Sequence, residues 1–578
     1  MNEGQSQGDT FSSSKYCWLP GARRQGAGRG VRRRCYSGPP SPERSAARQE
    51  AVAVQEAGLH VLDVLVVLAY LATIVGIGVY FARKQVSTDA YFAGGRSVPA
   101  WAVGFSVLAT LISSITFLAY PGEGFAGNWI RLVQGFMVPL VLVFVVGWLV
   151  PLYRQAIRLS AYEYFEKRFG YGARLYSSLA FTLMHFSKMG TVFFLLALAL
   201  AKMTGFDTYH VVLVLGTLTV IYTLVGGIEA VIWSDVLQSF VLVAGGLVCV
   251  GVLLLAPEAS PGAILSNAWA QGKMSLSHPD PGVSQFDFMK LTTLVMALNG
   301  IFYAVQKYGT DQTIVQRFLL AKTDKGATRA ALGGALMCVP VWTLFMFIGT
   351  LLWSFYQTAP LPEGTRADAV FPWFIMTQLP PGVTGIIIAA LIAAAMSSLD
   401  SDLNSLAAVG VEDYYRRFRP RATDKQSLKV GRWIVVVSGI FAIAVAMGYI
   451  AAAGTNTLAV VFSLYAIFSG GLAGLFALAF FTRRANRSGV YIGIVACVLF
   501  TAYAVLTSKS FQLGDLTIHL DMGRLNFTHH SYMIGVYSHI VLFVVGYVAS
   551  LFFKHEPRRK SSPFNLTHDQ RESRDGIS

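Results

Sequence analysis

Charged residues are scarce in this sequence of 578 residues: Asp, Glu, Lys and Arg make up 13% of it, against about 25% in ordinary soluble proteins. The apolar set AVILMFWYC accounts for 54%. This composition excludes a water-soluble globule. Apolar segments of about 20 residues, the length of a membrane-spanning helix, follow one another from residue 59 to residue 553. The sequence therefore predicts an all-α polytopic membrane protein, with the lipid bilayer as its surroundings.

Motifs for catalysis and energy conversion are also missing. The chain has no G-x-x-x-x-G-K-[ST] phosphate loop, no H-E-x-x-H and no paired C-x-x-C. Its five cysteines form neither a disulfide framework nor a metal spacing. No nucleophile with a neighbouring base is visible. We therefore expect neither an ATP-driven pump nor an enzyme, no organic cofactor, and no obligate protein partner.

Apolar runs separated by polar breaks predict thirteen spans. They lie near residues 59–82, 99–119, 129–152, 173–202, 208–226, 229–255, 288–308, 327–354, 381–408, 430–452, 454–481, 488–507 and 532–553. An odd number of spans places the two termini on opposite sides of the membrane.

The distribution of basic residues predicts which side is which. The net charge of +15 does not indicate nucleic-acid binding, because helical membrane proteins gather Lys and Arg in their cytoplasmic loops. With the N-terminus outside, 28 of the 46 basic residues fall inside and 7 outside. We therefore expect an N-out, C-in protein of the plasma (cytoplasmic or inner) membrane. Two basic residues, Lys188 and Lys307, remain within the membrane.

The first 57 residues fit this topology badly, because their nine basic residues would lie outside. They lack the apolar core of a signal peptide. They form either a disordered arm or a stretch upstream of the true start, and we favour the second. The next methionine is Met137, so a shorter product would need another start codon near Val52 or Val54.

Two spans contain polar residues that a plain lipid-facing helix would not carry. Residues 101–120 include Ser106, Thr110, Ser113, Ser114 and Thr116, and the span from Phe288 carries Asn299, Gly300, Tyr303, Gln306 and Lys307. Inverted-repeat transporters bind their solute between broken helices at corresponding positions. The alternative is that small hydroxyl residues only let helices pack closely.

Counting five helices from each of these spans gives two repeats of opposite orientation. The predicted organisation is an N-terminal arm (1–57), an accessory helix with an inside loop (58–98), a first repeat (99–255), an external loop (256–287), an inverted second repeat (288–481), two accessory helices (482–553) and a cytoplasmic tail (554–578).

Four blocks of sequence resemble the sodium:solute symporter family. The segment GGIEAVIWSDVLQ at 226–238 looks like the family signature GG-x-x-AV-x-W-[TS]-D-x-x-Q. AYEYFEKRF at 161–169, TDQTIVQR at 310–317, and LPPG at 379–382 followed by AAAMSSLDSDLNS at 393–405 agree with it. The resemblance implies a five-plus-five inverted-repeat fold, alternating access and sodium-coupled secondary transport of a small solute, with Na⁺ as the coupling ion.

The resemblance also implies where Na⁺ binds. The main site would use the backbone carbonyls of Ala109, Ile112 and Ala394 and the hydroxyls of Ser397 and Ser398. A second cation site would use Asp235, Asp400 and Ser401. Alternatively, Asp400 carries a proton, or faces the cytoplasmic vestibule and pairs with a loop arginine. We expect Asp402 only to face water.

The solute is less well defined by the sequence. Lys188 lies near the position of an arginine that holds the solute carboxylate in sialic acid transporters. The alternative is that Lys188 snorkels or pairs inside the protein, and His185 nearby is expected to be a satisfied interior histidine. The remaining candidates for contact with the solute are Ser113, Thr116, Asn299, Tyr303, Gln306 and Lys307. Positions where sugar transporters carry amides or carboxylates read Leu111, Gly135 and Phe462.

These residues favour a small organic anion, such as sialic acid or a monocarboxylate. A sodium-coupled sugar or other neutral-solute symporter is the alternative within the class. The alternatives of another class are a uniporter or channel, and a nutrient sensor with a transporter-like fold.

Overall fold

The computed structural model describes residues 59–255, 260–452, 470–508, 511–513 and 516–553. The predicted N-terminal arm, the tail and the first part of the predicted span 454–481 lie outside the described residues. Among the described residues, nine helices are long and apolar enough to cross a membrane, and one bent pair makes a tenth. The prediction of an all-helical, multi-pass membrane protein is confirmed at this level.

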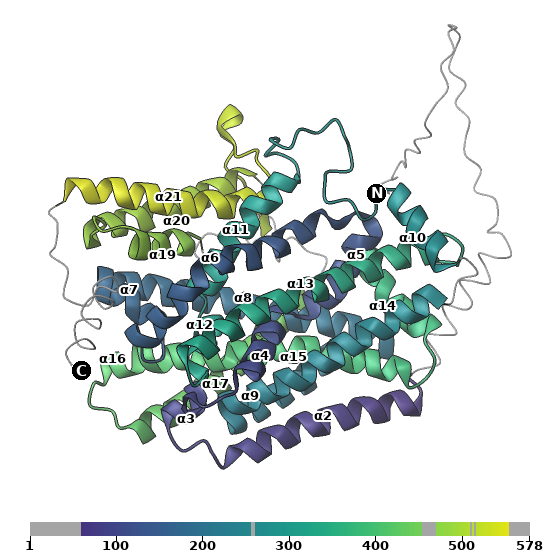
Figure 1. Ribbon diagram of the computed structural model, residues 1–578, viewed down its shortest axis with the longest axis horizontal. Coiled ribbons are helices and arrows are strands. Elements are labelled where there is room, and N and C mark those ends of the chain that lie inside the picture. Colours follow the sequence, from purple (N-terminus) through teal and green to yellow (C-terminus); the bar gives the residue numbers. More distant parts are fainter. Residues whose placement is uncertain (1–58, 256–259, 453–469, 509–510, 514–515, 554–578) are drawn as a thin grey trace, which may run out of the picture. The chain divides into compact units, whose positions relative to one another are not determined.

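The first half of the described chain is helical throughout (Figure 1). Its elements are α2 (Val61–Ala82), α3 (Thr88–Ala93), η1 (Gly94–Arg96), α4 (Ala100–Leu111), α5 (Ser114–Ala126), η2 (Trp129–Arg131), α6 (Leu132–Ala156), α7 (Tyr162–Phe169), α8 (Tyr171–Thr204), α9 (Thr208–Leu255) and α10 (Pro261–Ala270).

The second half adds one small hairpin to a further set of helices. Its elements are α11 (Thr293–Gly309), α12 (Gln312–Leu320), α13 (Asp324–Phe355), α14 (Ala367–Gln378), α15 (Val383–Val409), η3 (Gly410–Tyr415), α16 (Arg416–Phe418), α17 (Asp424–Ala451), α19 (Leu472–Phe481), α20 (Arg487–Ser508), η4 (Gly523–Leu525) and α21 (Ser531–Phe552), with strands β1 (Phe511–Leu513) and β2 (Leu516–Ile518) paired antiparallel.

Helix α9 contains two predicted spans. Its 48 residues would extend for about 70 Å as one straight helix, more than twice the thickness of a bilayer core. Gly227 interrupts it with φ 60° and ψ −161°, a conformation that residues with a Cβ rarely adopt. A Cβ there would lie 2.8 Å from the Gln85 side chain. The glycine pair of the 226–238 block therefore ends one predicted span and starts the next.

Both predicted broken helices are broken. Helices α4 and α5 are bent by 59°, because Ile112 and Ser113 are extended, with ψ of 127° and 177°. Thr310 and the extended Asp311 separate α11 from α12, and the Asp311 carboxylate accepts a hydrogen bond from the Thr313 amide at 2.9 Å. Each break leaves backbone groups without helical partners, which other groups can use.

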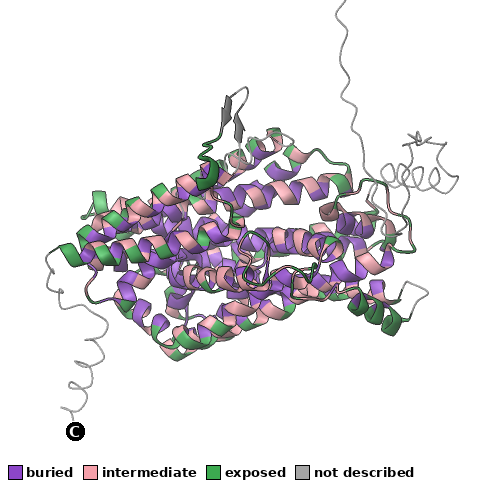
Figure 2. Cartoon of the chain, turned by 90° about the horizontal axis from the view of Figure 1, so that it is seen from above, coloured by how far each residue is buried: buried purple, intermediate pink, exposed green. Residues whose placement is uncertain are grey.

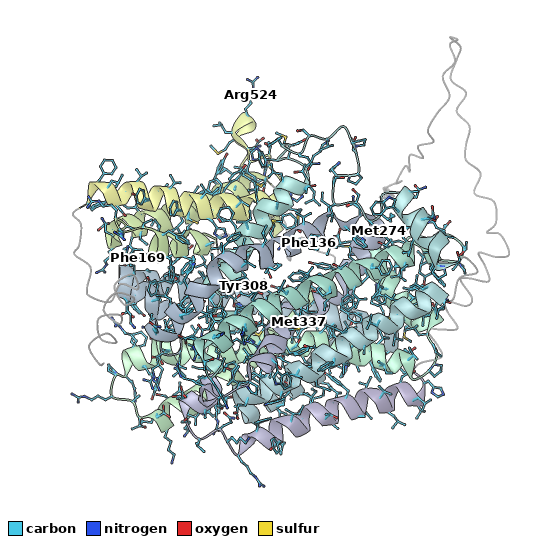
Figure 3. All side chains as sticks on the ribbon, viewed as in Figure 1. Phe136, Phe169, Met274, Tyr308, Met337 and Arg524 are labelled. Atoms are coloured by element: carbon cyan, nitrogen blue, oxygen red, sulfur yellow. The ribbon has the colours of Figure 1, made fainter. Side chains whose placement is uncertain are left out.

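Helix α15 forms the centre of the described bundle. In the 18-residue stretch of this span with the highest hydropathy, 89% is buried. A helix rich in Ala and Ser lets its neighbours approach closely. It packs against α2, α4, α8, α9 and α17, and Figure 2 shows that buried residues fill the interior while exposed ones lie on outer surfaces. Tyr308 is buried and Met337 is partly buried against the core, whereas Arg524 projects from the segment before α21 (Figure 3).

Candidate functional site

The α4–α5 break meets the middle of α15. The Ser397 hydroxyl lies 3.1 Å from the Ala109 carbonyl oxygen and 3.3 Å from that of Ala394. The Ser398 hydroxyl lies 3.2 Å from the carbonyl oxygen of Ile112. All five residues predicted for the main sodium site are therefore together, and each is at most 2% exposed.

This cluster has the chemistry of a sodium site. Ile112 is extended, so the last carbonyls of α4 lack helical donors. The two hydroxyls of α15 meet these carbonyls, and the cluster contains five oxygens and no formal charge. Hard cations such as Na⁺ are bound by oxygen ligands, and unwound carbonyls in a membrane protein supply them where water is excluded.

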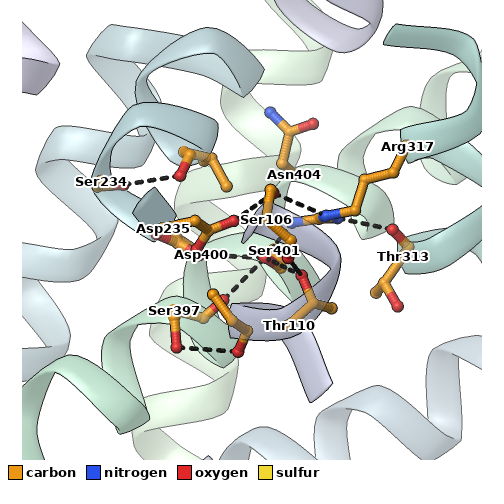
Figure 4. Close-up of polar contacts among 12 residues, drawn as sticks. Ser106, Thr110, Ser234, Asp235, Thr313, Arg317, Ser397, Asp400, Ser401 and Asn404 are labelled. Carbon is orange, nitrogen blue, oxygen red and sulfur yellow. Dashed lines mark hydrogen bonds and ion pairs between the residues drawn. The ribbon is translucent and has the colours of Figure 1, made fainter. Parts of the chain in front are cut away.

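One helical turn further along α15, a charged cluster adjoins the first (Figure 4). Asp235 accepts a hydrogen bond from the Ser106 hydroxyl, and its Oδ2 lies 3.1 Å from Nη2 of Arg317. Arg317 also donates to the hydroxyl of Ser106 at 2.9 Å and to the Thr313 carbonyl at 2.6 Å. Both charged groups are 0% exposed, so the guanidinium is held by this carboxylate and by neutral oxygens.

Ser401 joins the two clusters. Its hydroxyl donates to the Ser397 carbonyl at 2.8 Å and lies 2.6 Å from Nη2 of Arg317 and 3.2 Å from the Thr110 hydroxyl. Asp400, the residue before Ser401, accepts a hydrogen bond from the Tyr222 hydroxyl. The three predicted second-site residues thus lie around one buried region.

Two features of this region differ from the expectation. Asp400 is 0% exposed and has no ion pair among the described residues, so the idea that it faces a vestibule and pairs with a loop arginine is wrong. Arg317, which a count of basic residues between apolar runs assigns to an inside loop, instead pairs with Asp235. All nine residues of α12 are buried, which a count of basic residues between apolar runs cannot detect.

A second buried network links α8, the α11–α12 break and α15. Lys188 Nζ lies 3.1 Å from Oδ1 of Asp402, and His185 Nδ1 lies 2.8 Å from the same oxygen. On its other side, His185 Nε2 lies 3.2 Å from Oδ2 of Asp311, which is 2.5 Å from Lys307 Nζ. The network therefore runs Lys188, Asp402, His185, Asp311, Lys307.

This network corrects one expectation and supports two others. Asp402 does not face water, because it is 0% exposed and lies against Lys188 and His185. His185 is an interior histidine, as expected, with Asp311 and Asp402 on its two sides, but its Nδ1 makes no hydrogen bond within the described residues. Lys188 pairs inside the protein, the alternative that the sequence left open. Its side chain is still 24% exposed, so it remains reachable from the space beside α8.

The other predicted solute residues fall into two groups. Ser113 and Thr116 lie at the start of α5 and are 8% and 4% exposed. Gln306 lies one residue before Lys307, and its amide nitrogen is 3.9 Å from the Met184 sulfur of α8. Tyr303 packs against the main apolar core from the same helix.

Asn299 lies apart from these groups. Its amide nitrogen is 3.4 Å from the Tyr532 carbonyl oxygen of α21, so the side chain contacts α21. The sugar-transporter position Gly135 is also closed, because a Cβ there would lie 2.6 Å from the Trp342 ring. Phe462 lies outside the described residues.

Comparisons with known proteins identify relatives of this chain. A family model described as the sodium:solute symporter family matches residues 91–496. The sodium/sialic acid symporter NanT of Aliivibrio fischeri is 32% identical over 86% of this chain and 94% of its own length. SiaT of Proteus mirabilis, also a sodium/sialic acid symporter, is 32% identical over 78% of this chain and 89% of its own length.

A solved structure extends the likeness to three dimensions. It is a Na⁺-coupled sialic acid symporter in a substrate-bound, outward-open state, and it superposes with a TM-score of 0.78 at 29% identity. The match covers 86% of this chain and 100% of the solved chain.

Proposed function

The chain belongs to the sodium:solute symporter family, and we propose from this premise that it uses Na⁺ to import a small organic anion, with sialic acid as the first candidate. It is a sodium-coupled symporter by family and by its relatives. The single observation that carries the proposal is the five-oxygen cluster between the α4–α5 break and Ser397 and Ser398.

The coupling follows from the position of this cluster. An ion at that point would hold α4 and α15 together, because each helix supplies part of its oxygen shell. Binding Na⁺ would then favour one arrangement of the two helices, the outward-open one that accepts solute. Each Na⁺ that moves inward releases about 2.3 kcal/mol per 100 mV of membrane potential, which drives the solute inward with it.

The charges beside α8 support an anionic solute. Lys188 has its ammonium group on Asp402 but keeps a partly open side chain. A solute carboxylate can share or replace Asp402 as its partner, while His185 continues to hold Asp402. Sialic acid is proposed because NanT and SiaT carry it by name. The closed position at Gly135 argues against a hexose, although a sugar or other neutral solute stays the alternative within the class.

The topology proposed here is the one that the basic residues predict. Thirteen helices cross the plasma (cytoplasmic or inner) membrane, with the N-terminus outside and the C-terminus inside. The first repeat covers 99–255, the inverted second repeat covers 288–481, and 488–507 and 532–553 are accessory helices. The breaks at Ile112 and at Thr310, at corresponding places in the two repeats, support this division.

A second cation is proposed for the region of Asp235, Asp400 and Ser401. Two carboxylates and one guanidinium, all fully buried, leave one negative charge in a place where an unbalanced charge costs several kcal/mol. A second Na⁺ near Asp400 would neutralise it, and a proton on Asp400 is the alternative.

The proposed function predicts uptake that requires Na⁺. Purified protein in proteoliposomes should accumulate labelled sialic acid from Na⁺ buffer, and replacing Na⁺ by choline should reduce the rate to background. Lactate, pantothenate, proline and a hexose serve as competing solutes, and inhibition by only the anions supports the anion class. Uptake that is indifferent to Na⁺ would overturn the symporter proposal and favour a uniporter, a channel or a sensor.

Lys188→Met is expected to weaken solute binding while Na⁺ binding stays the same. A charge-assisted hydrogen bond contributes about 1.5–3 kcal/mol, so the solute KM should rise about tenfold or more. Half-saturating Na⁺ should change less than twofold. Lys202→Met, on the same helix near its outer end, is the matched control. An unchanged solute KM in Lys188→Met would remove this lysine from the solute site.

A further inference from the structure

An open groove lies between α2, α9 and α17, away from the ion and solute residues. Its volume is about 480 Å³, and it is lined by Ala82, Leu224, Val225, Lys429, Arg432, Trp433 and Val436. Helix α9 packs against both α2 and α17, so all three helices form its walls. Ala82 ends α2 and Lys429 lies in the second turn of α17, which is the cytoplasmic end of both helices in the topology proposed above.

The basic residues of the groove have no acidic partner. Among the described residues, no carboxylate lies within ion-pair distance of Lys429 or Arg432. Arg432 donates instead to the Gln85 carbonyl at 3.0 Å, and its guanidinium lies 5.6 Å from the centre of the Tyr91 ring. Neither contact neutralises its charge, so two positive charges stand at the groove without a counterion.

Several other arginines at this end of the molecule are paired with carboxylates. Arg154 lies 2.6 Å from Asp324, Arg417 lies 3.0 Å from Glu166, and Arg416 contacts both Glu412 and Asp424. The sequence therefore supplies carboxylates to several of its inner arginines. Arg432 is half-buried and has none among the described residues, and the exposed Lys429 stands beside it, so an anion from outside the chain would complete the pair.

The walls beyond these charges are apolar and face outward. Trp433 is 61% exposed, and Val437 and Ile440 follow on the same helix at 60% and 62%. A tryptophan at such a boundary is typical of the depth of lipid headgroups. A basic end and an apolar flank in one groove match the two parts of a phospholipid, the phosphate and an acyl chain.

We propose that this groove binds an anionic phospholipid of the inner leaflet, with the headgroup phosphate between Lys429 and Arg432 and an acyl chain along Val436 and Ile440. The proposal rests on the N-out orientation and is independent of the solute. Basic pockets between helices on the cytoplasmic side bind such headgroups in other membrane proteins.

The groove also adjoins the point where α9 breaks. Leu224 and Val225 form one wall, two residues before the interruption at Gly227, and the second part of α9 carries Asp235. A bound lipid would pack against the end of the first part of α9 and support the break. Anionic lipid should therefore increase the stability of the folded protein and the rate of transport.

The test compares variants of the full chain in nanodiscs made of phosphatidylcholine alone or with 30% phosphatidylglycerol. Phosphatidylglycerol should raise the unfolding midpoint of the wild type, and native mass spectrometry of the detergent-purified protein should detect retained phosphatidylglycerol. In Lys429→Gln the apparent affinity for phosphatidylglycerol should fall about fivefold, the effect of about one lysine near a membrane surface. Lys425→Gln, one turn earlier on α17, is the matched control and should behave as wild type.

Arg432→Gln should lower the apparent affinity for phosphatidylglycerol more than Lys429→Gln does. Because Arg432 also contacts Gln85 and Tyr91, its variant can be destabilised for structural reasons, so Lys429→Gln decides the outcome. Equal stabilisation by both lipid mixtures in the wild type, or unchanged phosphatidylglycerol retention in Lys429→Gln, would overturn the proposal. An equal loss of phosphatidylglycerol affinity in Lys425→Gln would show that the lipid responds to the general positive charge of this end. That result would overturn the proposal that the groove is a specific site.

Discussion

Ser398→Ala is expected to raise the Na⁺ concentration for half-maximal uptake by about tenfold to a hundredfold, the range in which loss of a supporting group lowers metal affinity. The Ser398 hydroxyl lies 3.2 Å from the carbonyl oxygen of Ile112, at the point where α4 has unwound. Removing it leaves the cluster with four of its five oxygens. The solute KM measured at saturating Na⁺ should stay close to the wild-type value.

The matched control is Ser438→Ala, which removes a serine hydroxyl that is also buried, 4% exposed, on α17. It should leave the Na⁺ dependence unchanged. Ser397→Ala should resemble Ser398→Ala, because its hydroxyl contacts the carbonyls of Ala109 and Ala394. Normal sodium dependence in both α15 variants would exclude the five-oxygen cluster as the coupling site.

This cluster was predictable from the sequence. Ser397 and Ser398 stand next to each other on an Ala-rich helix, and residues 101–120 carry hydroxyl groups that interrupt an apolar run. Both patterns are local, so they can be recognised without knowing how the helices pack. The resemblance to the family then associates the two segments, and the structure places them within hydrogen-bond distance.

The pairing of the buried charges was not predictable in the same way. Arg317 follows a polar break and precedes three further basic residues, Lys322, Lys325 and Arg329, so a charge count treats it as part of a cytoplasmic loop. Its nearest carboxylate, on Asp235, is 82 positions away in the chain. Only the fold shows that α12 turns back into the bundle and buries its whole length.

Asp402 illustrates the same limit. It lies two residues after Asp400 near the inner end of a predicted span, where a water-facing carboxylate is the simplest expectation. In the structure, Lys188 and His185 of α8 both lie within about 3 Å of it. Long-range charge pairs depend on which faces of two helices meet, and one sequence carries no direct record of that.

Arg317→Met is expected to destabilise the folded protein by about 3–5 kcal/mol, the usual effect of removing one partner of a buried ion pair. Asp235 and Asp400 would then share a dry region without any guanidinium, since both are 0% exposed. Na⁺-driven uptake should be lost. The measurement is the midpoint of thermal unfolding in detergent, with uptake in proteoliposomes as the functional readout.

Arg366→Met is the matched control. Arg366 forms an ion pair of 2.9 Å with Asp368, but its side chain is 80% exposed, and exposed pairs contribute about 0–1 kcal/mol. Adding Asp235→Asn to Arg317→Met should recover much of the lost stability, because the buried carboxylate disappears with its partner. If the double variant is as unstable as the single one, the ion pair is not the cause of the loss.

Asp400→Asn should shift stability in the opposite direction to Arg317→Met. The buried charges are then one carboxylate and one guanidinium, which neutralise each other, and the asparagine oxygen still accepts the hydrogen bond of Tyr222. In Na⁺-free buffer the midpoint of thermal unfolding of the variant should be at least as high as that of the wild type. Added Na⁺ should raise this midpoint less than it does in the wild type. A normal Na⁺ response in Asp400→Asn would contradict a second cation at this carboxylate. The five-oxygen cluster would then be the source of coupling, because its neutral oxygens are not changed by the substitution.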